Sequence, residues 1–286
     1  MMKLASERAV KKRGAYGAIA PAALTEKEFD WISRFLYERT GITLANKQAL
    51  VMGRLDKRLR ELGIGNYGDY FSLLGRPGYE AETTTALDLL TTNETYFFRE
   101  PKHFEFLQKV VFPTLQKTRP CRFWSAASSS GEEAYTIAMT AAHYLQHDYW
   151  EVLGTDISTR ILDKARRALY PMTAAEKIPT ALLRQYCLKG RDEYQDYFLI
   201  DPKIRAKVSF SYTNLNDALP DLGLFEVIFL RNVMIYFDQE TKQKLVQRLT
   251  EKLRPGGYFI VSHSETLNGL QSSLKLLSPS IYQRSA

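Results

Sequence analysis

The stretch Cys121–Ala138, which reads CRFWSAASSSGEEAYTIA, predicts a short apolar strand, a tight turn and a helix in direct succession. The turn, Ala126–Gly131, carries almost no side chain, so a ligand can lie against its backbone. A strand, a small-residue turn and a helix N-terminus together form the usual cofactor seat of an open α/β sheet. An ordinary strand–helix turn is the alternative that this stretch alone leaves open.

The two glutamates at the helix start, Glu132 and Glu133, indicate which ligand would fit there. A phosphate-binding loop places Lys-Ser or Lys-Thr at this point. Carboxylates stabilise the helix dipole themselves and repel a pyrophosphate. A cationic or hydroxyl-rich cofactor is compatible with them.

Length, composition and charge limit the class of protein and the partners that can be expected. The chain has 286 residues, 45% of them hydrophobic, which is enough for one large domain or two small ones. No apolar run approaches the ~18–20 residues of a membrane span, and the N-terminus lacks the apolar core of a signal peptide, so we expect a cytoplasmic protein. Cys121 and Cys187 fit no metal spacing, and we expect no metal. The net charge of +7 suggests an acidic partner, either nucleic acid or an acidic protein surface.

Residues 1–23 are basic and are expected to form a flexible tail, and residues 24–90 form a helical N-terminal domain. Thr25, with Glu28 in capping-box spacing, begins its first helix. A second helix is expected near residues 46–62, where the residues with helical spacing that should be buried are Val51, Leu55, Leu59 and Leu62.

The second helix carries a basic face. Lys47, Arg54 and Arg58 fall within roughly 40° of one another on a helical projection, and Lys57 widens the face. Most such faces are simply solvated. The excess of cations favours docking on an acidic partner.

The segment Thr91–Pro101, TTNETYFFREP, has neither a helical nor a strand period. Its polar residues either satisfy the backbone between two domains or line a cleft. Pro101 is suited to the first position of the next helix.

Candidate ligand contacts follow three further strands. Strand Trp150–Gly154 ends in Thr155-Asp156, and an acidic residue about 20–30 positions past the small-residue turn is suited to ribose hydroxyls. A helix cap is the alternative for Asp156, although Ser158 is equally suited to that task. Asn214-Leu215 follow strand 208–212, where a cofactor base would lie.

The third of these strands, Phe225–Leu230, is apolar throughout, as expected of a central parallel strand. Arg231-Asn232 come directly after it and should therefore face the ligand crevice. Further on, a helix at 239–253 should end before Pro255-Gly256-Gly257, and strands should follow at 258–262 and 280–284, the latter closing the sheet. Residues 171–206 interrupt the strand–helix alternation and indicate an insertion.

Taken together, these features predict a nucleoside-binding α/β sheet without a phosphate-binding lysine. They favour S-adenosylmethionine over NAD or ATP, because S-adenosylmethionine has ribose hydroxyls and a sulfonium but no phosphate.

Five motifs in this order resemble the CheR family of chemotaxis-receptor glutamate methyltransferases: TTNETYFFRE, WSAASSSGEEAY, GTDIS, NL and RNVMIYF. The resemblance extends from Leu24 to the C-terminus. It implies an all-α domain (24–90) followed by a Rossmann-like S-adenosylmethionine-dependent methyltransferase domain (91–286) with an antiparallel β insertion at about 171–206. It also implies methylation of glutamates on the cytoplasmic domain of methyl-accepting chemoreceptors, with S-adenosylhomocysteine as product.

The resemblance further implies roles for single residues. The residues that would contact S-adenosylmethionine are Asn93, Thr95, Arg99, Glu133, Asp156, Asn214, Leu215, Arg231 and Asn232. Arg99 and Tyr236 would lie beside the reacting centre, with packing beneath the site as the alternative for Tyr236. The residues that would dock on the glutamate-rich receptor are Lys47, Arg54, Lys57 and Arg58.

Two other functions stay open. A nucleic-acid methyltransferase would suit the charge, but amino-directed DNA enzymes usually place a Pro-Pro-aromatic segment where this chain has Arg231-Asn232-Val233-Met234. A non-catalytic S-adenosylmethionine-binding regulator is the other alternative. We expect no nucleic acid, no membrane insertion and a monomer. Some family members bind a receptor peptide through a Gly-rich turn in the insertion, whereas Lys189–Tyr194 contains a single glycine.

Overall fold

The computed structural model describes residues 21–115, 118–145 and 147–285. Most of the expected tail, residues 1–23, therefore lies outside the described residues. Contacts divide the chain into two compact units: one runs up to Leu36 and includes Leu44–Leu90, and the other comprises Tyr37–Thr43 and the chain from Thr91 onward. None of the helices in the described residues is both long and apolar enough to cross a membrane.

The first unit is helical. Its helices are α2 (Glu26–Thr40, whose last turn belongs to the second unit), α3 (Gln48–Leu62), α4 (Tyr67–Phe71) and α5 (Glu80–Leu90). The capping box is confirmed, because the Thr25 amide donates to Glu28 Oε2 at 2.8 Å and the Glu28 amide donates to Thr25 Oγ1 at 3.3 Å. The expected burial of Leu62 is wrong: it is 40% exposed, since it ends α3 just before Gly63 turns the chain at φ 69°.

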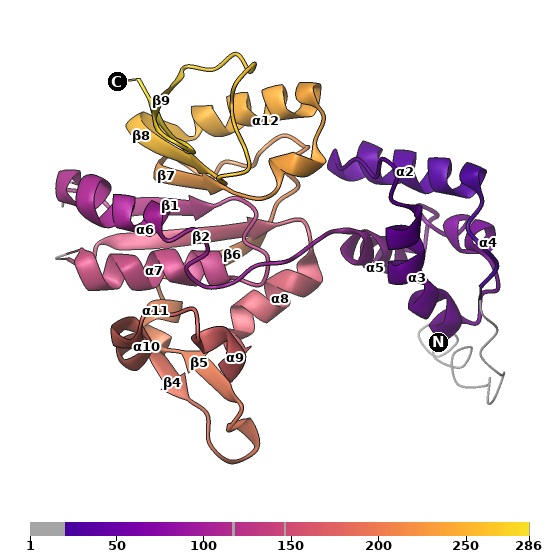
Figure 1. Ribbon diagram of the computed structural model, residues 1–286, viewed down its shortest axis with the longest axis horizontal. Helices are drawn as coiled ribbons and strands as arrows, with labels where there is room; N and C mark the ends of the chain where they lie inside the picture. The colour runs from indigo at the N-terminus through magenta and orange to yellow at the C-terminus, as the bar shows by residue number, and fades with distance from the viewer. Residues whose placement is uncertain (1–20, 116–117, 146, 286) are drawn as a thin grey trace, which may run out of the picture. The chain divides into compact units, whose positions relative to one another are not determined.

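The second unit is built on a seven-stranded sheet with the order β6-β2-β1-β7-β8-β10-β9 (Figure 1). The strands are β1 (Cys121–Ser125), β2 (Trp150–Asp156), β6 (Val208–Tyr212), β7 (Phe225–Leu230), β8 (Leu253–Val261), β9 (Leu274–Ser278) and β10 (Ile281–Arg284). β6, β2, β1, β7 and β8 are parallel, and β10 is antiparallel to both of its neighbours. The strand order reverses between β1 and β7, which is where α/β sheets bind ligands.

Helices cover both faces of this sheet (Figure 1). They are α6 (Lys102–Phe106), continued by η1 (Leu107–Val111) and η2 (Phe112–Thr114), then α7 (Glu132–Tyr144), α8 (Thr159–Arg167), η4 (Met234–Tyr236) and α12 (Gln239–Glu251). β7 contributes Val227 and Phe229 to the core under α6 and α7, and Ile228 and Leu230 to the core under α12. Because alternate residues of a strand face opposite sides, this explains why β7 is apolar throughout.

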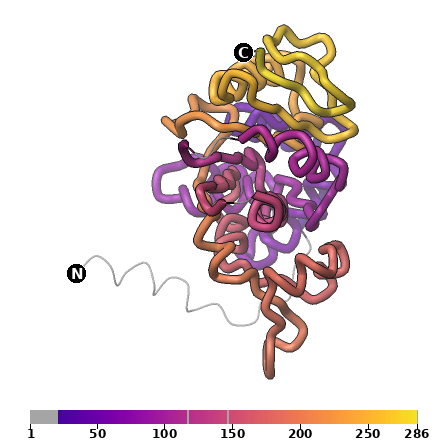
Figure 2. The backbone as a smooth tube through the Cα atoms, turned by 90° about the vertical axis from the view of Figure 1, so that its left-hand side faces the viewer, coloured from indigo at the N-terminus to yellow at the C-terminus, as the bar shows by residue number. Residues whose placement is uncertain are grey.

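The insertion is a separate three-stranded antiparallel sheet with the order β3-β5-β4. Its elements are β3 (Leu169–Pro171), α9 (Met172–Ala175), α10 (Thr180–Tyr186), β4 (Cys187–Lys189), η3 (Asp192–Tyr194), β5 (Tyr197–Ile200) and α11 (Pro202–Arg205). Figures 1 and 2 show the β4–β5 connection projecting from the body of the second unit. The fold class expected from the sequence is thus confirmed.

Two expectations near the C-terminus are wrong. β8 begins at Leu253 and runs through Pro255-Gly256-Gly257 instead of starting at 258. Gly256 has φ 76°, and the pairing with β7 shifts register here, so the Pro-Gly-Gly run forms an irregularity within the strand rather than a stop. In addition, β10 does not close the sheet, because β9 pairs with its outer edge.

Candidate active site

The small-residue turn after β1 is held against the neighbouring strands. The Ala126 amide donates to the Phe229 carbonyl at 2.9 Å, and the Ser128 amide donates to the Thr155 carbonyl at 2.8 Å. Gly131 has φ 95°, and a Cβ there would lie 2.9 Å from the Cβ of Ala165. The turn therefore requires glycine at this point, because Gly131 has a left-handed backbone and packs closely against neighbouring side chains.

Asp156 ends β2 and faces this turn. Its Oδ2 accepts the Ser129 amide at 2.9 Å, and its Oδ1 accepts the Ser158 amide at 3.0 Å. The hydroxyl of Ser158, not Asp156, caps α8 by accepting the Ile161 amide. The structure thus brings Asp156 to the small-residue turn.

The irregular segment Thr91–Pro101 is fastened to the carboxyl edge of the sheet. The Ser129 hydroxyl donates to the Asn93 carbonyl at 2.9 Å, and the Phe98 amide donates to Thr136 Oγ1 at 3.2 Å. Thr95 is half-buried in the same segment. Phe98 and Glu100 both have left-handed backbone conformations, with φ 54° and 57°. Non-glycine residues held in this region of the backbone map cluster at functional sites.

Arg231, directly after β7, lies at the centre of a buried ionic cluster. Its side chain is 2% exposed and contacts Glu133 Oε2 at 2.9 Å and Glu100 Oε2 at 3.2 Å. It also donates to the Arg99 carbonyl at 2.5 Å. Ser125 donates to the other oxygen of Glu133 at 2.7 Å. Arg231 therefore joins the start of α7 to the segment before α6.

The two carboxylates of this cluster differ in pKa. Burial raises the pKa of Glu133 above its ordinary value by more than the neighbouring Arg231 charge lowers it. Burial also raises the pKa of Glu100, but the Arg231 charge and the Ser262 hydroxyl outweigh it and leave this pKa below its ordinary value. Burial and the Arg231 charge lower the pKa of His103 to about 3, so this imidazole is neutral at physiological pH.

Arg99 and Tyr236 lie in different segments of the chain, Arg99 before α6 and Tyr236 in η4. Arg99 donates to the Glu94 carbonyl at 3.0 Å, and its guanidinium lies 5.5 Å from the ring centre of Tyr96. Tyr236 is half-buried in η4, where its carbonyl accepts the amide and the hydroxyl of Thr43 at 2.9 and 3.0 Å.

The remaining predicted contacts lie at the ends of β6 and β7. Asn214 donates to the Arg39 carbonyl at 2.6 Å and to Asp217 at 2.9 Å. Leu215 is buried in the core under α12. Asn232 donates to the Ser262 hydroxyl at 2.8 Å. All three lie beyond the carboxyl end of a parallel strand, as expected.

The chemistry of these groups indicates which cofactor they would suit. Among the described residues, the buried Ser128 hydroxyl and the buried Nε of Arg231 find no hydrogen-bond partner. Buried polar atoms are seldom left unpaired, so a polar ligand at this edge would satisfy them. The turn offers carboxylates and hydroxyls but no lysine, which fits ribose hydroxyls and a cation better than a phosphate. The residues present therefore fit S-adenosylmethionine.

Sequence reasoning missed Glu100 and Glu265. Glu100 stood inside the polar segment but was not singled out. Glu265 accepts the amides of Asn232 and Ser262 at 2.9 and 3.0 Å and so braces the loop after β7. Glu265 follows the carboxyl end of β8, so the switch-point rule that indicates Arg231 after β7 also indicates Glu265.

The four residues expected to dock a receptor lie on or beside α3. Lys47 directly precedes the helix, and Arg54 donates to the Leu90 carbonyl at 2.7 Å. Arg58 makes two hydrogen bonds to Glu82 and contacts Glu61 at 3.2 Å. The side chain of Lys57 is 88% exposed. Arg54 and Arg58 therefore also make contacts inside the helical unit, and Lys57 contacts Glu61 at 3.9 Å.

Two family descriptions match the chain: "CheR methyltransferase, all-alpha domain" over residues 27–91 and "CheR methyltransferase, SAM binding domain" over residues 93–282. Chemotaxis protein methyltransferase 2 of Pseudomonas aeruginosa is 38% identical over 263 residues, which are 90% of this chain and 93% of that protein. The chemotaxis protein methyltransferase of Escherichia coli is 36% identical over 266 residues, 91% of each. A solved S-adenosylmethionine-dependent methyltransferase from Mesorhizobium loti is 16% identical with a TM-score of 0.31, covering 51% of this chain and 48% of its own, too distant to carry an argument.

Proposed function

Since the chain belongs to the CheR methyltransferase family, we propose that it transfers the methyl group of S-adenosylmethionine to glutamate side chains of chemoreceptors in the cytoplasm, giving glutamyl methyl esters. The observation that carries this proposal is the match of both family descriptions, in order, over residues 27–91 and 93–282. The carboxylate-lined edge of the sheet, which suits a nucleoside without phosphates, supports the same cofactor.

The cofactor would be held by the groups at the carboxyl edge. Asp156 would accept the ribose hydroxyls, and Asn214 and Leu215 would hold the adenine. Glu133 would lie near the cationic end of the cofactor. The other contacts carried over from the family are Asn93, Thr95, Arg99, Arg231 and Asn232. When bound, S-adenosylmethionine supplies a methyl group on a positively charged sulfur.

The protein's own part in the reaction is chiefly positioning. A substrate glutamate has a pKa near ~4.3 and is already ionised at neutral pH, so no general base is needed. Arg99 orients the incoming carboxylate, and Tyr236 borders the reacting centre. Correct placement of two reactants alone can supply several kcal/mol of the barrier reduction.

Arg99→Ala should lower the methylation rate by roughly 10²-fold, as misplacement of a reactant does, with S-adenosylmethionine affinity changed much less. The rate would be followed with purified protein and a receptor cytoplasmic fragment, and the affinity by calorimetry. Arg76→Ala, which removes an exposed arginine of the helical unit, serves as the matched control. A normal rate in the Arg99→Ala variant would remove Arg99 from the mechanism.

Receptor docking would use the basic face of α3. Lys47, Arg54, Lys57 and Arg58 would meet the glutamate-rich methylation region of the receptor. Lys57 projects furthest into solvent, whereas the Glu82 pairing of Arg58 neutralises part of its charge. Docking by exposed charges weakens as salt rises.

The proposal as a whole is tested by transfer of labelled methyl groups to a receptor fragment. Wild-type fragment should be labelled, and a fragment with alanine at the glutamates of its methylation region should not. Equal labelling of both fragments would contradict glutamate methylation. Labelling of added DNA would favour the nucleic-acid alternative, and cofactor binding without any transfer would favour a regulator.

A further inference from the structure

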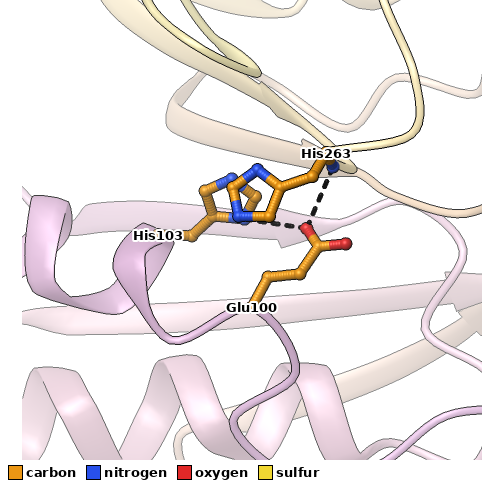
Figure 3. A group of neighbouring side chains, drawn as sticks. All are labelled: Glu100, His103 and His263. Atoms are coloured by element: carbon orange, nitrogen blue, oxygen red, sulfur yellow. Dashed lines mark hydrogen bonds and ion pairs between the residues drawn. The ribbon is translucent and has the colours of Figure 1, made fainter.

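Glu100, His103 and His263 form a cluster that the proposed reaction does not use (Figure 3). Glu100 precedes α6, His103 lies in its first turn, and His263 follows β8. One ligand atom from each residue lies within 4.8 Å of the others. The two imidazole rings lie with their centres 4.8 Å apart beside the Glu100 carboxylate.

Ser280 fixes the tautomers of both histidines. Its hydroxyl donates to the Pro279 carbonyl at 2.5 Å. The same oxygen lies 2.7 Å from His103 Nε2 and 3.1 Å from His263 Nδ1. A hydroxyl has a single hydrogen, so with that hydrogen on the Pro279 carbonyl both rings donate to Ser280. The other two ring nitrogens, His103 Nδ1 and His263 Nε2, therefore carry bare lone pairs.

The lone pair of His103 faces a second acceptor. His103 is fully buried, and its Nδ1 has no hydrogen-bond partner among the described residues. This nitrogen lies 3.5 Å from Glu100 Oε2. A buried acceptor that faces another acceptor without a hydrogen between them is unfavourable. A cation between these two atoms would give His103 Nδ1 the partner that it lacks.

The charges nearby leave room for such a cation. Arg231 is the guanidinium that contacts both Glu100 and Glu133. One guanidinium can balance one of these two carboxylates. The cluster with neutral histidines therefore carries a formal charge of −1 when both glutamates are ionised.

The supporting hydrogen bonds match those of metal sites. A histidine that binds a metal usually donates its other N–H to an acceptor, which sets the tautomer; Ser280 provides this for both rings. Ligating carboxylates are also hydrogen-bonded; the Ser262 hydroxyl donates to Glu100 Oε1 at 2.8 Å, and Oε2, which faces His103 Nδ1, also accepts the His263 amide at 3.3 Å and contacts Arg231 at 3.2 Å.

The distances and donor types favour zinc. Ligands about 2.1 Å from a tetrahedral Zn²⁺ lie about 3.4 Å apart, close to the 3.5 Å between Glu100 Oε2 and His103 Nδ1. His263 is exposed, so its ring can adjust and the fourth position is open to water. Two imidazoles with one carboxylate suit Zn²⁺ and its first-row neighbours rather than Mg²⁺ or Ca²⁺.

We propose that Glu100, His103 and His263 form a binding site for a first-row transition-metal ion, with Zn²⁺ the best match. The ion would link the segment before α6 to the end of β8. It would stabilise the folded chain by binding it in preference to the unfolded chain. This proposal does not rest on methyl transfer.

The test is a titration of chelator-treated, untagged full-length protein with Zn²⁺ alone, without S-adenosylmethionine or receptor. We expect one ion per chain with a Kd of ~1 μM or tighter and a rise in Tm on binding. His263→Ala, which changes an exposed side chain, should weaken binding at least about 10-fold and remove the Tm rise. His143→Ala, an exposed histidine outside the cluster, is the control and should bind as wild type does.

A second variant separates tautomer control from ligation. Ser280 has φ 64°, so Ser280→Gly removes the hydroxyl without backbone strain and should weaken Zn²⁺ binding about 10-fold. Co²⁺ should give a visible absorption band in the wild-type protein that is lost in His263→Ala. Absence of stoichiometric binding by the wild-type chain, or equal binding by His263→Ala, would overturn the proposal.

Discussion

Arg58 on α3 and Arg231 after β7 make the same kind of contact in two different settings. Each pairs with two carboxylates, Arg58 with Glu82 and Glu61 and Arg231 with Glu133 and Glu100. The Arg58 side chain is 27% exposed, whereas that of Arg231 is 2% exposed. Sequence reasoning assigned both to binding.

The two arginines differ in the desolvation cost of their ion pairs and in their position in the fold. Arg58 joins α3 to α5 through Glu82, which also accepts the Tyr70 hydroxyl at 2.7 Å, and water still screens the pair. Burying a guanidinium with two carboxylates costs so much desolvation that a buried ion pair is weak evidence for stability. Arg231 bears that cost at the switch point of the sheet, which makes it the stronger candidate for function.

The largest expected effect separates these two arginines directly. Arg231→Met leaves Glu100 and Glu133 buried without their cation, and should lower the free energy of unfolding by about 3–5 kcal/mol. Arg58→Met breaks a partly exposed pair and should lower it by about 1 kcal/mol. Urea denaturation of both variants measures this. Equal losses would mean that burial does not distinguish the two clusters.

Glu132 tests what a nearby arginine does for a buried carboxylate. It adjoins Glu133 but forms no ion pair with an arginine among the described residues, and burial raises its pKa from 4.5 to about 7. Because the folded chain holds this proton more tightly, stability is unaffected below pH 4.5, falls as the pH rises from 4.5 to about 7, and stays lower above that. The accumulated loss is on the order of 3 kcal/mol.

Glu132→Gln removes this ionisation. The stability of the variant relative to the wild-type chain should therefore increase from pH 5 to pH 8. Denaturant unfolding at both pH values measures this. Glu240→Gln on the exposed face of α12 is the control and should show no such trend. A gain that is independent of pH would contradict the assigned pKa.

A smaller effect concerns the exposed part of the basic face. Lys57→Ala should leave the unfolding free energy within about 0.5 kcal/mol of wild type but slow receptor methylation several-fold at low salt, and less at high salt. Lys109→Ala removes another exposed lysine with an acidic residue four positions away. Equal slowing by both variants would indicate a general charge effect instead of docking by α3.

The smallest effect is expected at Tyr236. Tyr236→Phe keeps the ring and should lower the methylation rate a few-fold if the hydroxyl borders the reacting centre, with S-adenosylmethionine affinity unchanged. Steady-state rates with a receptor fragment measure this. An unchanged rate would leave Tyr236 as packing beneath the site.

The features that could be predicted from the sequence are those that a short stretch of residues determines. A few neighbouring residues were enough to predict three of them: the Thr25–Glu28 capping box, the small-residue turn at Ala126–Gly131 and the apolar strand β7. β9 was missed because its sequence, LKLLS, does not alternate: Leu276 and Leu277 are adjacent and both exposed on an edge strand.

The parts of the site that escaped prediction depend on long-range contacts. Arg231 and Glu133 were each identified, but as separate cofactor contacts, and they are 98 positions apart in the chain. His103 and Ser280 are 177 positions apart. No spacing rule connects such residues, and only the sheet brings the end of β8 and the loop before β10 to the start of α6.

The central claim is the formation of a glutamyl methyl ester, and the stability of the transferred label in base tests it most directly. Receptor labelled with S-adenosylmethionine carrying a radioactive methyl group would be treated with mild alkali. Release of the label as volatile methanol is the predicted result, because carboxyl methyl esters hydrolyse in base. Label that stays on the receptor would mean methylation of nitrogen or carbon and would contradict the account.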